Sequence, residues 1–210
     1  MLPAYDAPST GQLSAMMLDA FRETGVVILR DFVPKEACAA LLQRALELVD
    51  EFDASAIRSV FSTMYIFKPP RLGGEVVCHQ DSTYLYTEPE SCIGFWFALE
   101  DATTENGCMY FIPGAHRMPL KQRDYRKPDG KLITETLDDT PWPVEERLAA
   151  EATAGTLVIF DGRAPHMSGP NTSGKSRHAY TLHVIDNKCH YPAENGLQRD
   201  ADLPLRGFDS

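Results

Sequence analysis

The chain has 210 residues, enough for one domain with a substantial core, and its 43% hydrophobic and 24% charged residues are ordinary for a globular protein. Its 30 acidic against 20 basic residues give a formal net charge of −10, which argues against nucleic acid or an anionic membrane as a partner, because phosphate groups favour a positive surface. No stretch approaches the roughly 20 consecutive apolar residues of a membrane-spanning helix, so no membrane partner is expected.

The cysteines and the N-terminus indicate a cytoplasmic protein. The five cysteines are scattered, an odd number without a Cys-x-x-Cys pair, so neither a disulfide framework nor a thiolate zinc site is expected. The first residues, MLPAYDAPSTGQ, lack the charged start and apolar core of a secretion signal. We therefore expect reduced thiols and a cytoplasmic location.

The first part of the chain has the pattern of helices. Apolar residues recur at helical spacing within 10–25, and Gly25 suits the C-terminal end of a helix. The stretch 26–32, VVILRDF, is typical of a short buried strand. Pro34 suits the first turn of a second helix over 34–52, where its missing N–H is not needed.

From Met64 onward, short β-rich runs dominate the sequence. Turn-forming pairs such as Asn106-Gly107 and Asp161-Gly162 separate them. The expected strands cover 64–68, 74–79, 92–100, 107–114, 155–162 and 178–185. Helices followed by many short strands predict a β-sandwich or barrel backed by N-terminal helices.

Polar residues of the metal-binding type stand at the ends of these strands. His79 and Asp81, two positions apart, end the run 74–79, while His166 follows the strand expected at 155–162 and Arg177 opens the next one. Two histidines and one carboxylate on one face of a metal leave three coordination positions open, which suits non-haem Fe(II) with dioxygen and a chelating co-substrate. The planar guanidinium of Arg177 would suit the far carboxylate of a dicarboxylic co-substrate.

The pattern indicates a metal site only when His79, Asp81, His166 and Arg177 are taken together. His79-x-Asp81 alone is a weak signal, since two polar residues at this spacing occur by chance in many proteins. Together with a distant histidine and an arginine at strand ends, the set is much more specific. The plainer interpretation of the first three residues is a hydrogen-bonded polar cluster, and that of Arg177 is a surface salt bridge.

In these segments the chain resembles the phytanoyl-CoA dioxygenase superfamily of Fe(II)/2-oxoglutarate oxygenases, and within it the branch of phytanoyl-CoA dioxygenase domain-containing proteins. The similar segments are FRETGVVILRDFVPKEAC, MYIFKPPRLGGEVVCHQDSTYLYTEP, GFWFALEDATTENGCMYFIPGAHR, GTLVIFDGRAPHMSGPNTSGKSRHAYTLHV and YPAENGLQ. The resemblance implies a double-stranded β-helix, a jelly-roll or cupin-like barrel, in a single domain over 1–210. Its parts would be a helical part over 1–63, a β-helix core over 64–190 and a tail over 191–210.

The resemblance also implies a site and a reaction. The implied residues are His79, Asp81 and His166 for the iron, and Arg177, Ser168, Met64 and Trp96 for 2-oxoglutarate. The implied reaction decarboxylates 2-oxoglutarate to succinate and CO₂ and hydroxylates a small-molecule substrate, with an anionic or acyl compound as one possibility and ascorbate in support. The resemblance leaves the oligomeric state open.

Three of these residues also fit plainer roles. Met64 and Trp96 lie on apolar strands, where alternate side chains face the interior, so simple core packing would explain them too. For Met64 taken alone, core packing is the favoured interpretation. Ser168 stands in HMSGPNTSG, where a turn residue is equally expected.

The remaining histidines are not expected to be metal ligands. His116 follows a tight turn, and His190 stands in a polar C-terminal segment. His178 and His183 are five positions apart on one strand, so they point to opposite faces. Cys78 should alternate away from the metal as a small packed residue.

Two other functions compete with the oxygenase. A cupin-like metal isomerase or hydrolase would use the same three ligands on a similar barrel but would not need Arg177. A shortened, catalytically weak or inactive relative would serve only as a binding protein.

The resemblance breaks at Thr63–Met64. Relatives carry a long further stretch before MYIFK, which helps to wall the co-substrate pocket and offers a lysine to it. Here Thr63 joins Met64 directly, and no residue of this chain is assigned the role of that lysine. Either the chain is a shortened form, or residues at this junction are missing from the sequence. A chain truly this short is expected to keep the metal ligands, to bind 2-oxoglutarate weakly, to turn over poorly, to expose apolar barrel surface and to self-associate.

The segment 116–131, HRMPLKQRDYRKPDGK, concentrates six basic residues against two aspartates in an otherwise acidic chain. It lies between two expected strands, where loops in such folds cover the mouth of the barrel. One interpretation is a lid that attracts an anionic substrate through Arg123 and Arg126, and the other is a solvated loop.

Overall fold

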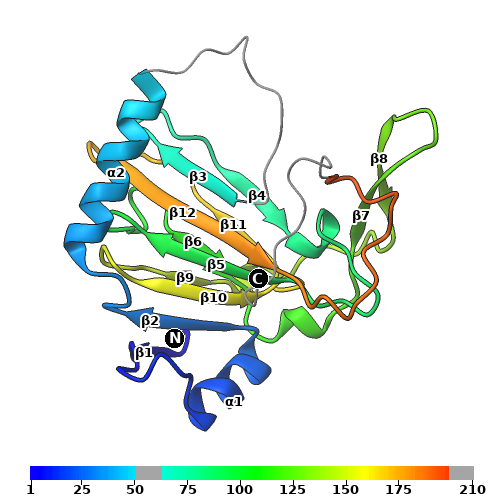
Figure 1. Ribbon diagram of the computed structural model, residues 1–210, viewed down its shortest axis with the longest axis horizontal. Helices are drawn as coiled ribbons and strands as arrows, with labels where there is room; N and C mark the ends of the chain where they lie inside the picture. Colours follow the sequence, from blue (N-terminus) through cyan, green and yellow to red (C-terminus); the bar gives the residue numbers. More distant parts are fainter. Residues whose placement is uncertain (51–62, 199–210) are drawn as a thin grey trace.

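In residues 1–50 and 63–198, which the computed structural model describes, two β-sheets face each other across one hydrophobic core, with two helices beside them (Figure 1). The helices are α1 (Ala15–Thr24) and α2 (Lys35–Asp50). The large sheet has the order β1 (Ala4–Asp6), β2 (Val26–Arg30), β10 (Leu157–Asp161), β5 (Ile93–Ala98), β12 (Arg177–Val184) and β3 (Thr63–Lys68). The small sheet has the order β4 (Val76–His79), β11 (His166–Ser168), β6 (Met109–Phe111) and β9 (Leu148–Ala150). A separate hairpin joins β7 (Gln122–Arg126) to β8 (Leu132–Thr136).

Both N-terminal helices form where the sequence predicts them. The Oγ of Ser14 accepts a hydrogen bond from the backbone N–H of Met17 at 3.3 Å and caps α1. Gly25 ends this helix in the left-handed conformation, with φ 78°. Helix α2 begins directly after Pro34, and the last two residues expected in it, 51 and 52, lie outside the described residues. Within the described ranges, no helix has the length and hydropathy needed to cross a bilayer.

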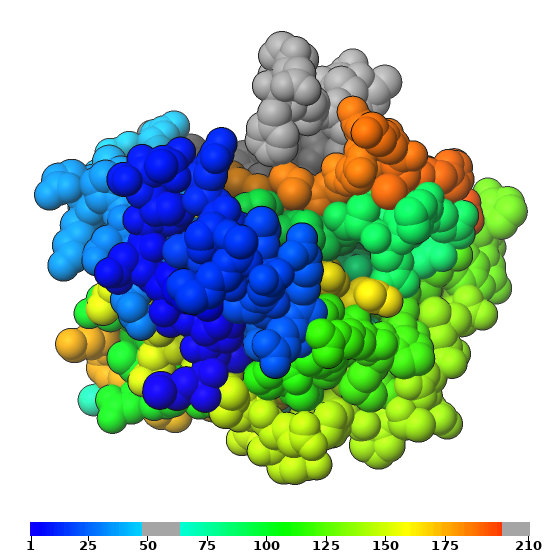
Figure 2. Space-filling model, turned by 90° about the horizontal axis from the view of Figure 1, so that it is seen from below, coloured from blue at the N-terminus to red at the C-terminus, as the bar shows by residue number. Residues whose placement is uncertain are grey.

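Strand β2 carries the N-terminal part of the chain into the large sheet. It pairs antiparallel with β10, and its successive side chains point to opposite faces. Val26 and Ile28 reach the core between the sheets, whereas Val27 and Leu29 pack on the outer face with Met17 of α1. In Figure 2, the N-terminal residues and α1 (blue) cover a broad part of the face toward the viewer. The described residues 1–50 therefore contribute strands β1 and β2 as well as the helices.

The main core lies between the two sheets and surrounds the site described below. Trp96, Val158 and Phe160 enter it from the large sheet, and Phe111 and Ala150 enter it from the small sheet. The rings of Phe111 and Phe160 lie 5.4 Å apart across the interface. Burial of each large apolar side chain contributes about 1.5–3 kcal/mol to stability. The prediction of a mainly β fold with N-terminal helices is confirmed.

The segment 116–131 is not the open loop that the sequence predicted. Most of it forms β7 and the turn that leads to β8, and this hairpin stands to one side of the sheets (Figure 1). Gly130 closes the turn with φ 83°. The sequence of β7, QRDYR, has no apolar face, so hydrophobic alternation could not reveal this strand.

Strands β3 and β4 form the free edges of their sheets. β3 ends the large sheet and β4 ends the small sheet. Apolar side chains on these edges are exposed, with relative exposures of 50% for Met64, 46% for Phe67 and 70% for Val77. The expectation that the short chain leaves apolar barrel surface uncovered stays a prediction. The residues that precede Thr63 at the predicted break, 51–62, lie outside the described residues.

Candidate active site

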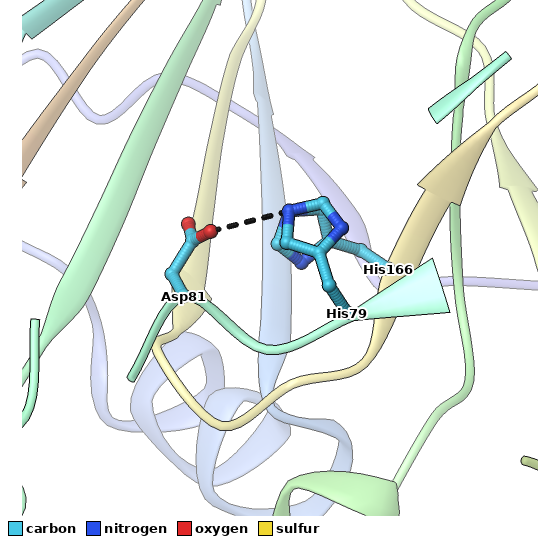
Figure 3. Close-up of side chains that lie close together, drawn as sticks. All are labelled: His79, Asp81 and His166. Carbon is cyan, nitrogen blue, oxygen red and sulfur yellow. Dashed lines mark ion pairs between the residues drawn. The ribbon is translucent and has the colours of Figure 1, made fainter. Parts of the chain in front are cut away.

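Strand pairing brings His79 and His166 together. His79 ends β4, His166 begins β11, and the two are direct partners in the antiparallel register. Because opposite residues share one face of a sheet, both rings point the same way, and their centroids lie 4.3 Å apart. Asp81 opens a short 3-10 helix (Asp81–Thr83), and its carboxylate points toward the two rings (Figure 3).

These three side chains place their ligand atoms around one point. Oδ1 of Asp81 lies 3.4 Å from Nε2 of His79 and 3.7 Å from Nε2 of His166. These separations are longer than direct hydrogen bonds. Nitrogen and oxygen atoms bound about 2.1 Å from one metal ion lie about 3–3.5 Å from each other. The separation of 3.4 Å falls in this range and that of 3.7 Å lies just beyond it, so these three residues could hold a shared metal ion.

Backbone carbonyls orient both histidine rings. Nδ1 of His79 lies 2.8 Å from the carbonyl oxygen of Val77, and Nδ1 of His166 lies 3.0 Å from that of Ala164. A carbonyl only accepts, so Nδ1 is the donor in each ring. In the neutral ring, Nε2 then keeps a free lone pair on the side of Asp81, which is the form that binds a metal.

The electrostatics of the cluster favour the metal-binding forms of Asp81 and His166, but not of His79. Burial alone would raise the pKa of Asp81, but the surrounding histidines outweigh it and hold this pKa well below its usual range. Burial lowers the pKa of His166 to about 4, so its ring is neutral at pH 7. Burial lowers the pKa of His79 as well, but the contact with Asp81 outweighs it and leaves this pKa above its ordinary value. An ionised carboxylate and neutral imidazoles are the species that bind a cation, so a metal ion would displace the proton that Asp81 favours on His79.

A further histidine, which the sequence reasoning set aside, also reaches the cluster. Nε2 of His183 lies 2.6 Å from Oδ2 of Asp81. The ionised carboxylate only accepts, so His183 donates this hydrogen bond and orients the carboxylate. His183 stands an even number of positions after Arg177 on β12, and this parity could have placed it on the site face. His178 lies on the opposite face, as predicted. There its Nδ1 is 2.6 Å from the hydroxyl of Tyr65.

All the residues that were predicted for the site line one cavity of about 300 Å³, which we call the Arg177 cavity. These residues are Met64, His79, Asp81, Trp96, His166, Ser168 and Arg177. Most of the remaining wall is apolar and includes Ile66, Met109 and Phe160. The volume lies at the lower end of the range for small-molecule sites. The structure thus joins the metal candidates and the co-substrate candidates in one space.

Arg177 is buried at the wall of this cavity, and some of its N–H donors make no hydrogen bond with the described residues. Its side chain is 2% exposed, and its Nη2 donates to the carbonyl oxygen of Gly107 at 3.1 Å. Its Nε and Nη1 have no hydrogen-bond partner among the described residues, and neither has the buried Oγ of Ser168. Buried polar groups are almost always paired, and two donors on one planar fork match a carboxylate. The unpaired groups therefore indicate an anionic ligand, and the surface salt bridge suggested for Arg177 is wrong.

Lys68 is a second buried cation next to Arg177. The two residues are register partners on β3 and β12, so they share a face of the large sheet. The Nζ of Lys68 donates to the carbonyl oxygens of Gly74 and Gly169. Burial, and then the charge of Arg177, lower the pKa of Lys68 to about 8. No sequence pattern predicts this lysine for the site, because only the pairing of β3 with β12 places it there.

Trp96 and Met64 contribute differently to the Arg177 cavity. Trp96 is 1% exposed, and the Cζ of Arg177 lies 5.6 Å from its ring centroid. It therefore serves both the core and the cavity wall. Met64 is half exposed at the edge strand β3, so the core-packing interpretation favoured for it is wrong.

The other residues that were set aside lie away from the cluster. His116 is buried against Gly25, at the C-terminal end of α1. His190 forms a backbone bridge with Glu88. Cys78 lines a different, polar cavity, and burial raises the pKa of its thiol to about 11. Of these, none lines the Arg177 cavity.

The two arginines of the proposed lid have partners of their own. Arg123 forms an ion pair with Glu194 at 3.3 Å and lies over the ring of Tyr86. Arg126 donates to the carbonyl oxygens of Gly196 at 3.1 Å and Gly130 at 3.2 Å. Both arginines thus hold the segment 194–196 against the hairpin, and their attraction for an anionic substrate stays a prediction.

Proteins of a known family are similar in sequence to about two thirds of this chain. The model of the phytanoyl-CoA dioxygenase (PhyH) family matches residues 50–179. Phytanoyl-CoA dioxygenase 1 of Oryza sativa subsp. japonica is 48% identical over 148 residues, which cover 67% of this chain and 50% of the rice protein. Phytanoyl-CoA dioxygenase domain-containing protein 1 of Danio rerio is 40% identical over 150 residues, covering 70% of this chain and 52% of that protein. The chain spans about half the length of the curated relatives it matches.

Solved structures share the fold. The non-heme alpha ketoglutarate dependent carbocyclase SnoK from nogalamycin biosynthesis superposes with a TM-score of 0.70 at 19% identity, covering 97% of each chain. The epimerase SnoN, in complex with Fe3+, alpha ketoglutarate and nogalamycin RO, gives 0.66 at 17% identity, covering 92% of this chain and 95% of that one. Identities this low establish the fold, here a double-stranded β-helix, and not the activity. The family match and the sequence identities go further: this chain belongs to the phytanoyl-CoA dioxygenase (PhyH) family.

Proposed function

We propose that the protein is an Fe(II)- and 2-oxoglutarate-dependent dioxygenase that hydroxylates a small molecule. One observation carries the proposal: the unpaired donors of buried Arg177 open into the same cavity as the cluster of His79, Asp81 and His166. A metal isomerase or hydrolase on such a barrel has no use for this arginine. The names of the relatives and the Fe3+ and alpha ketoglutarate bound to SnoN agree with this function.

The residues present suit the proposed metal. Two imidazoles and one carboxylate are the ligand set of non-haem Fe(II), and in our proposal His79, Asp81 and His166 hold the ion. His183 keeps the carboxylate of Asp81 in place through Oδ2, which leaves Oδ1 for the metal. When bound, the iron and 2-oxoglutarate would supply the oxidising chemistry with dioxygen as the oxidant: one oxygen atom enters succinate as 2-oxoglutarate loses CO₂, and the other hydroxylates a substrate C–H bond.

The residues also suit the proposed co-substrate. The Nε and Nη1 of Arg177 and the hydroxyl of Ser168 would receive the far carboxylate of 2-oxoglutarate, which satisfies three buried groups at once. The charge of Lys68 adds to the attraction without reaching the cavity wall. Trp96 and the apolar wall exclude water, which strengthens the pairing between the carboxylate and Arg177.

A reducing location suits this chemistry. All five cysteines are free thiols, which is the usual state in the cytoplasm. We therefore propose a cytoplasmic enzyme, with ascorbate as a supporting reductant that keeps the iron in the Fe(II) state.

Metal removal and restoration test the function directly. The purified protein is stripped with a chelator, and succinate formation from 2-oxoglutarate is followed by NMR before and after addition of Fe(II) and ascorbate. We expect slow succinate formation without any substrate, strict dependence on Fe(II), and inhibition by Zn(II) competing for the same ligands. A protein that binds Fe(II) and 2-oxoglutarate but forms no succinate would support the binding-protein alternative. A protein that binds the metal alone would support the isomerase or hydrolase.

The lowered pKa of Lys68 predicts the pH dependence of co-substrate binding. Protonated Lys68 favours the bound dianion, and its pKa is about 8, so the affinity for 2-oxoglutarate should be full below this pH and fall as the pH rises through it. Calorimetry with the Mn(II)-loaded protein at pH 7 and pH 8.5, under anaerobic conditions, measures this change. In Lys68→Gln the affinity should be lower and nearly constant between the two pH values. An equal pH dependence in both proteins would contradict the role of Lys68.

A further inference from the structure

A second cavity lies beside the cluster, on the side of the hairpin. It measures about 380 Å³ and shares Met64, His79, Asp81 and His183 with the Arg177 cavity. Its own walls are Tyr84, Leu85, Asp124, Leu132, Gly196 and Leu197, and we call it the Asp124 cavity. A molecule in this space therefore touches the same cluster as a molecule in the Arg177 cavity. Within the proposed function, this is where the substrate would lie.

The fold holds Asp124 firmly at the wall of this cavity. Asp124 stands in the middle of β7 and is 8% exposed. Its Oδ1 accepts a hydrogen bond of 2.6 Å from the hydroxyl of Thr134 on the partner strand β8. Gly196 packs so closely that a Cβ there would lie 2.9 Å from the Cβ of Asp124. The carboxylate is therefore a built part of the wall rather than a mobile surface group.

The charge of Asp124 has no cationic partner in the described part of the chain. Its side-chain hydrogen bond comes from a neutral hydroxyl, and its second oxygen has no protein donor there. The neighbouring Arg123 and Arg126 are occupied by Glu194, Gly196 and Gly130, and neither lines the cavity. Among the described residues, no lysine or arginine lines it at all. Buried carboxylates are seldom left without a compensating charge.

Apart from Asp124 and the polar cluster residues shared with the Arg177 cavity, the wall is mostly apolar and suits a substrate with an apolar body. Met64, Leu85, Leu132 and Leu197 surround the space, together with the ring of Tyr84. An anion would meet the uncompensated carboxylate of Asp124 within this apolar enclosure, which is unfavourable. A hydroxyl group would find an acceptor but would leave the charge uncompensated.

From this we infer that the Asp124 cavity takes a small lipophilic amine as substrate, with its ammonium group on Asp124 and its apolar body beside the metal cluster. The inference rests on the proposed function and names its substrate class. It differs from the anionic or acyl substrate that the basic segment 116–131 suggested, because the arginines of that segment are held away from the cavity.

Three probes that share a phenyl ring on a four-carbon chain and differ in their polar head group test the assignment. They are 4-phenylbutylamine, 4-phenylbutanol and 4-phenylbutyrate, titrated by calorimetry into the full chain loaded with Mn(II) and 2-oxoglutarate. We expect the amine to bind about tenfold or more tightly than the alcohol, because an ion pair is replaced by a hydrogen bond from a neutral donor that leaves the charge of Asp124 uncompensated, and the carboxylate to bind least. In Asp124→Asn, which keeps the shape and removes the charge, the preference for the amine should disappear. Asp129→Asn, in the exposed turn of the same hairpin, is the matched control and should keep it.

Each outcome decides between distinct explanations. An amine preference that persists in Asp124→Asn would mean that the amine binds the metal directly, and it would overturn the inference. Strongest binding of the carboxylate, or no binding of any probe, would also overturn it. Succinate formation by the wild type without probes separates the oxygenase proposal from the substrate-class proposal. If succinate forms and no amine binds, only the amine substrate class is wrong. If amines bind through Asp124 but no succinate forms, the proposed function fails and the amine site stands.

Discussion

Asp81→Ala is expected to abolish succinate formation, with a loss of about 100-fold or more. The substitution removes the one anionic ligand of the cluster, and histidine ligands alone leave the charge of a divalent ion uncompensated. It also removes the oxygen that accepts the hydrogen bond from Nε2 of His183. Succinate formation with Fe(II) and 2-oxoglutarate measures the activity, and calorimetry with Mn(II) measures the metal affinity.

An exposed aspartate provides the control for this prediction. Asp186 follows β12 on the surface, and within the described part of the chain its side chain accepts a hydrogen bond from the backbone N–H of Lys188, so Asp186→Ala should behave as the wild type. Circular dichroism and thermal unfolding establish that both variants keep the fold. If folded Asp81→Ala retained metal affinity and full succinate formation, the assignment of His79, Asp81 and His166 as the metal ligands would be wrong.

Arg177→Ala should weaken the binding of 2-oxoglutarate by about 30-fold or more while metal affinity stays within about twofold. Truncating one partner of a buried, hydrogen-bonded charge pair costs about 2–5 kcal/mol, and each 1.4 kcal/mol is a factor of about ten. The metal should be unaffected, because Arg177 makes no contact with the cluster; its hydrogen bond goes to Gly107. Calorimetry with Mn(II), first alone and then with 2-oxoglutarate, separates the two affinities.

Arg177→Lys distinguishes the charge of the guanidinium from its shape. A lysine keeps the charge but loses the planar fork, so the affinity for 2-oxoglutarate should fall between those of the wild type and Arg177→Ala. Arg30→Ala, which removes an exposed arginine paired with Asp6, controls for the loss of a positive charge. Unchanged co-substrate binding in Arg177→Ala would remove the main support for an oxygenase and favour the cupin-like isomerase or hydrolase.

Much of the site can be predicted from the sequence, because its residues stand at the ends of apolar runs. His79, Asp81, His166 and Arg177 each sit where a strand begins or ends, and apolar runs and turn residues are local signals. The resemblance to a family then adds Met64, Trp96 and Ser168, and all of these residues line one cavity. The same local signals predicted both N-terminal helices, since the caps and helical spacing lie within a few residues of each other.

Other parts of the site depend on pairings between distant strands, and the sequence carries no local signal for them. The register of β3 with β12 sets Lys68 beside Arg177, and the position of β12 next to the cluster brings His183 to the carboxylate of Asp81. The β7–β8 hairpin was missed because its polar residues alternate without an apolar face, yet it supplies Asp124 to the second cavity. The sequence by itself thus determined the helices, most of the strands and the residues at their ends. Only the tertiary structure decided which of these polar groups are left buried without partners, because burial and pairing are set by contacts between segments far apart in the chain.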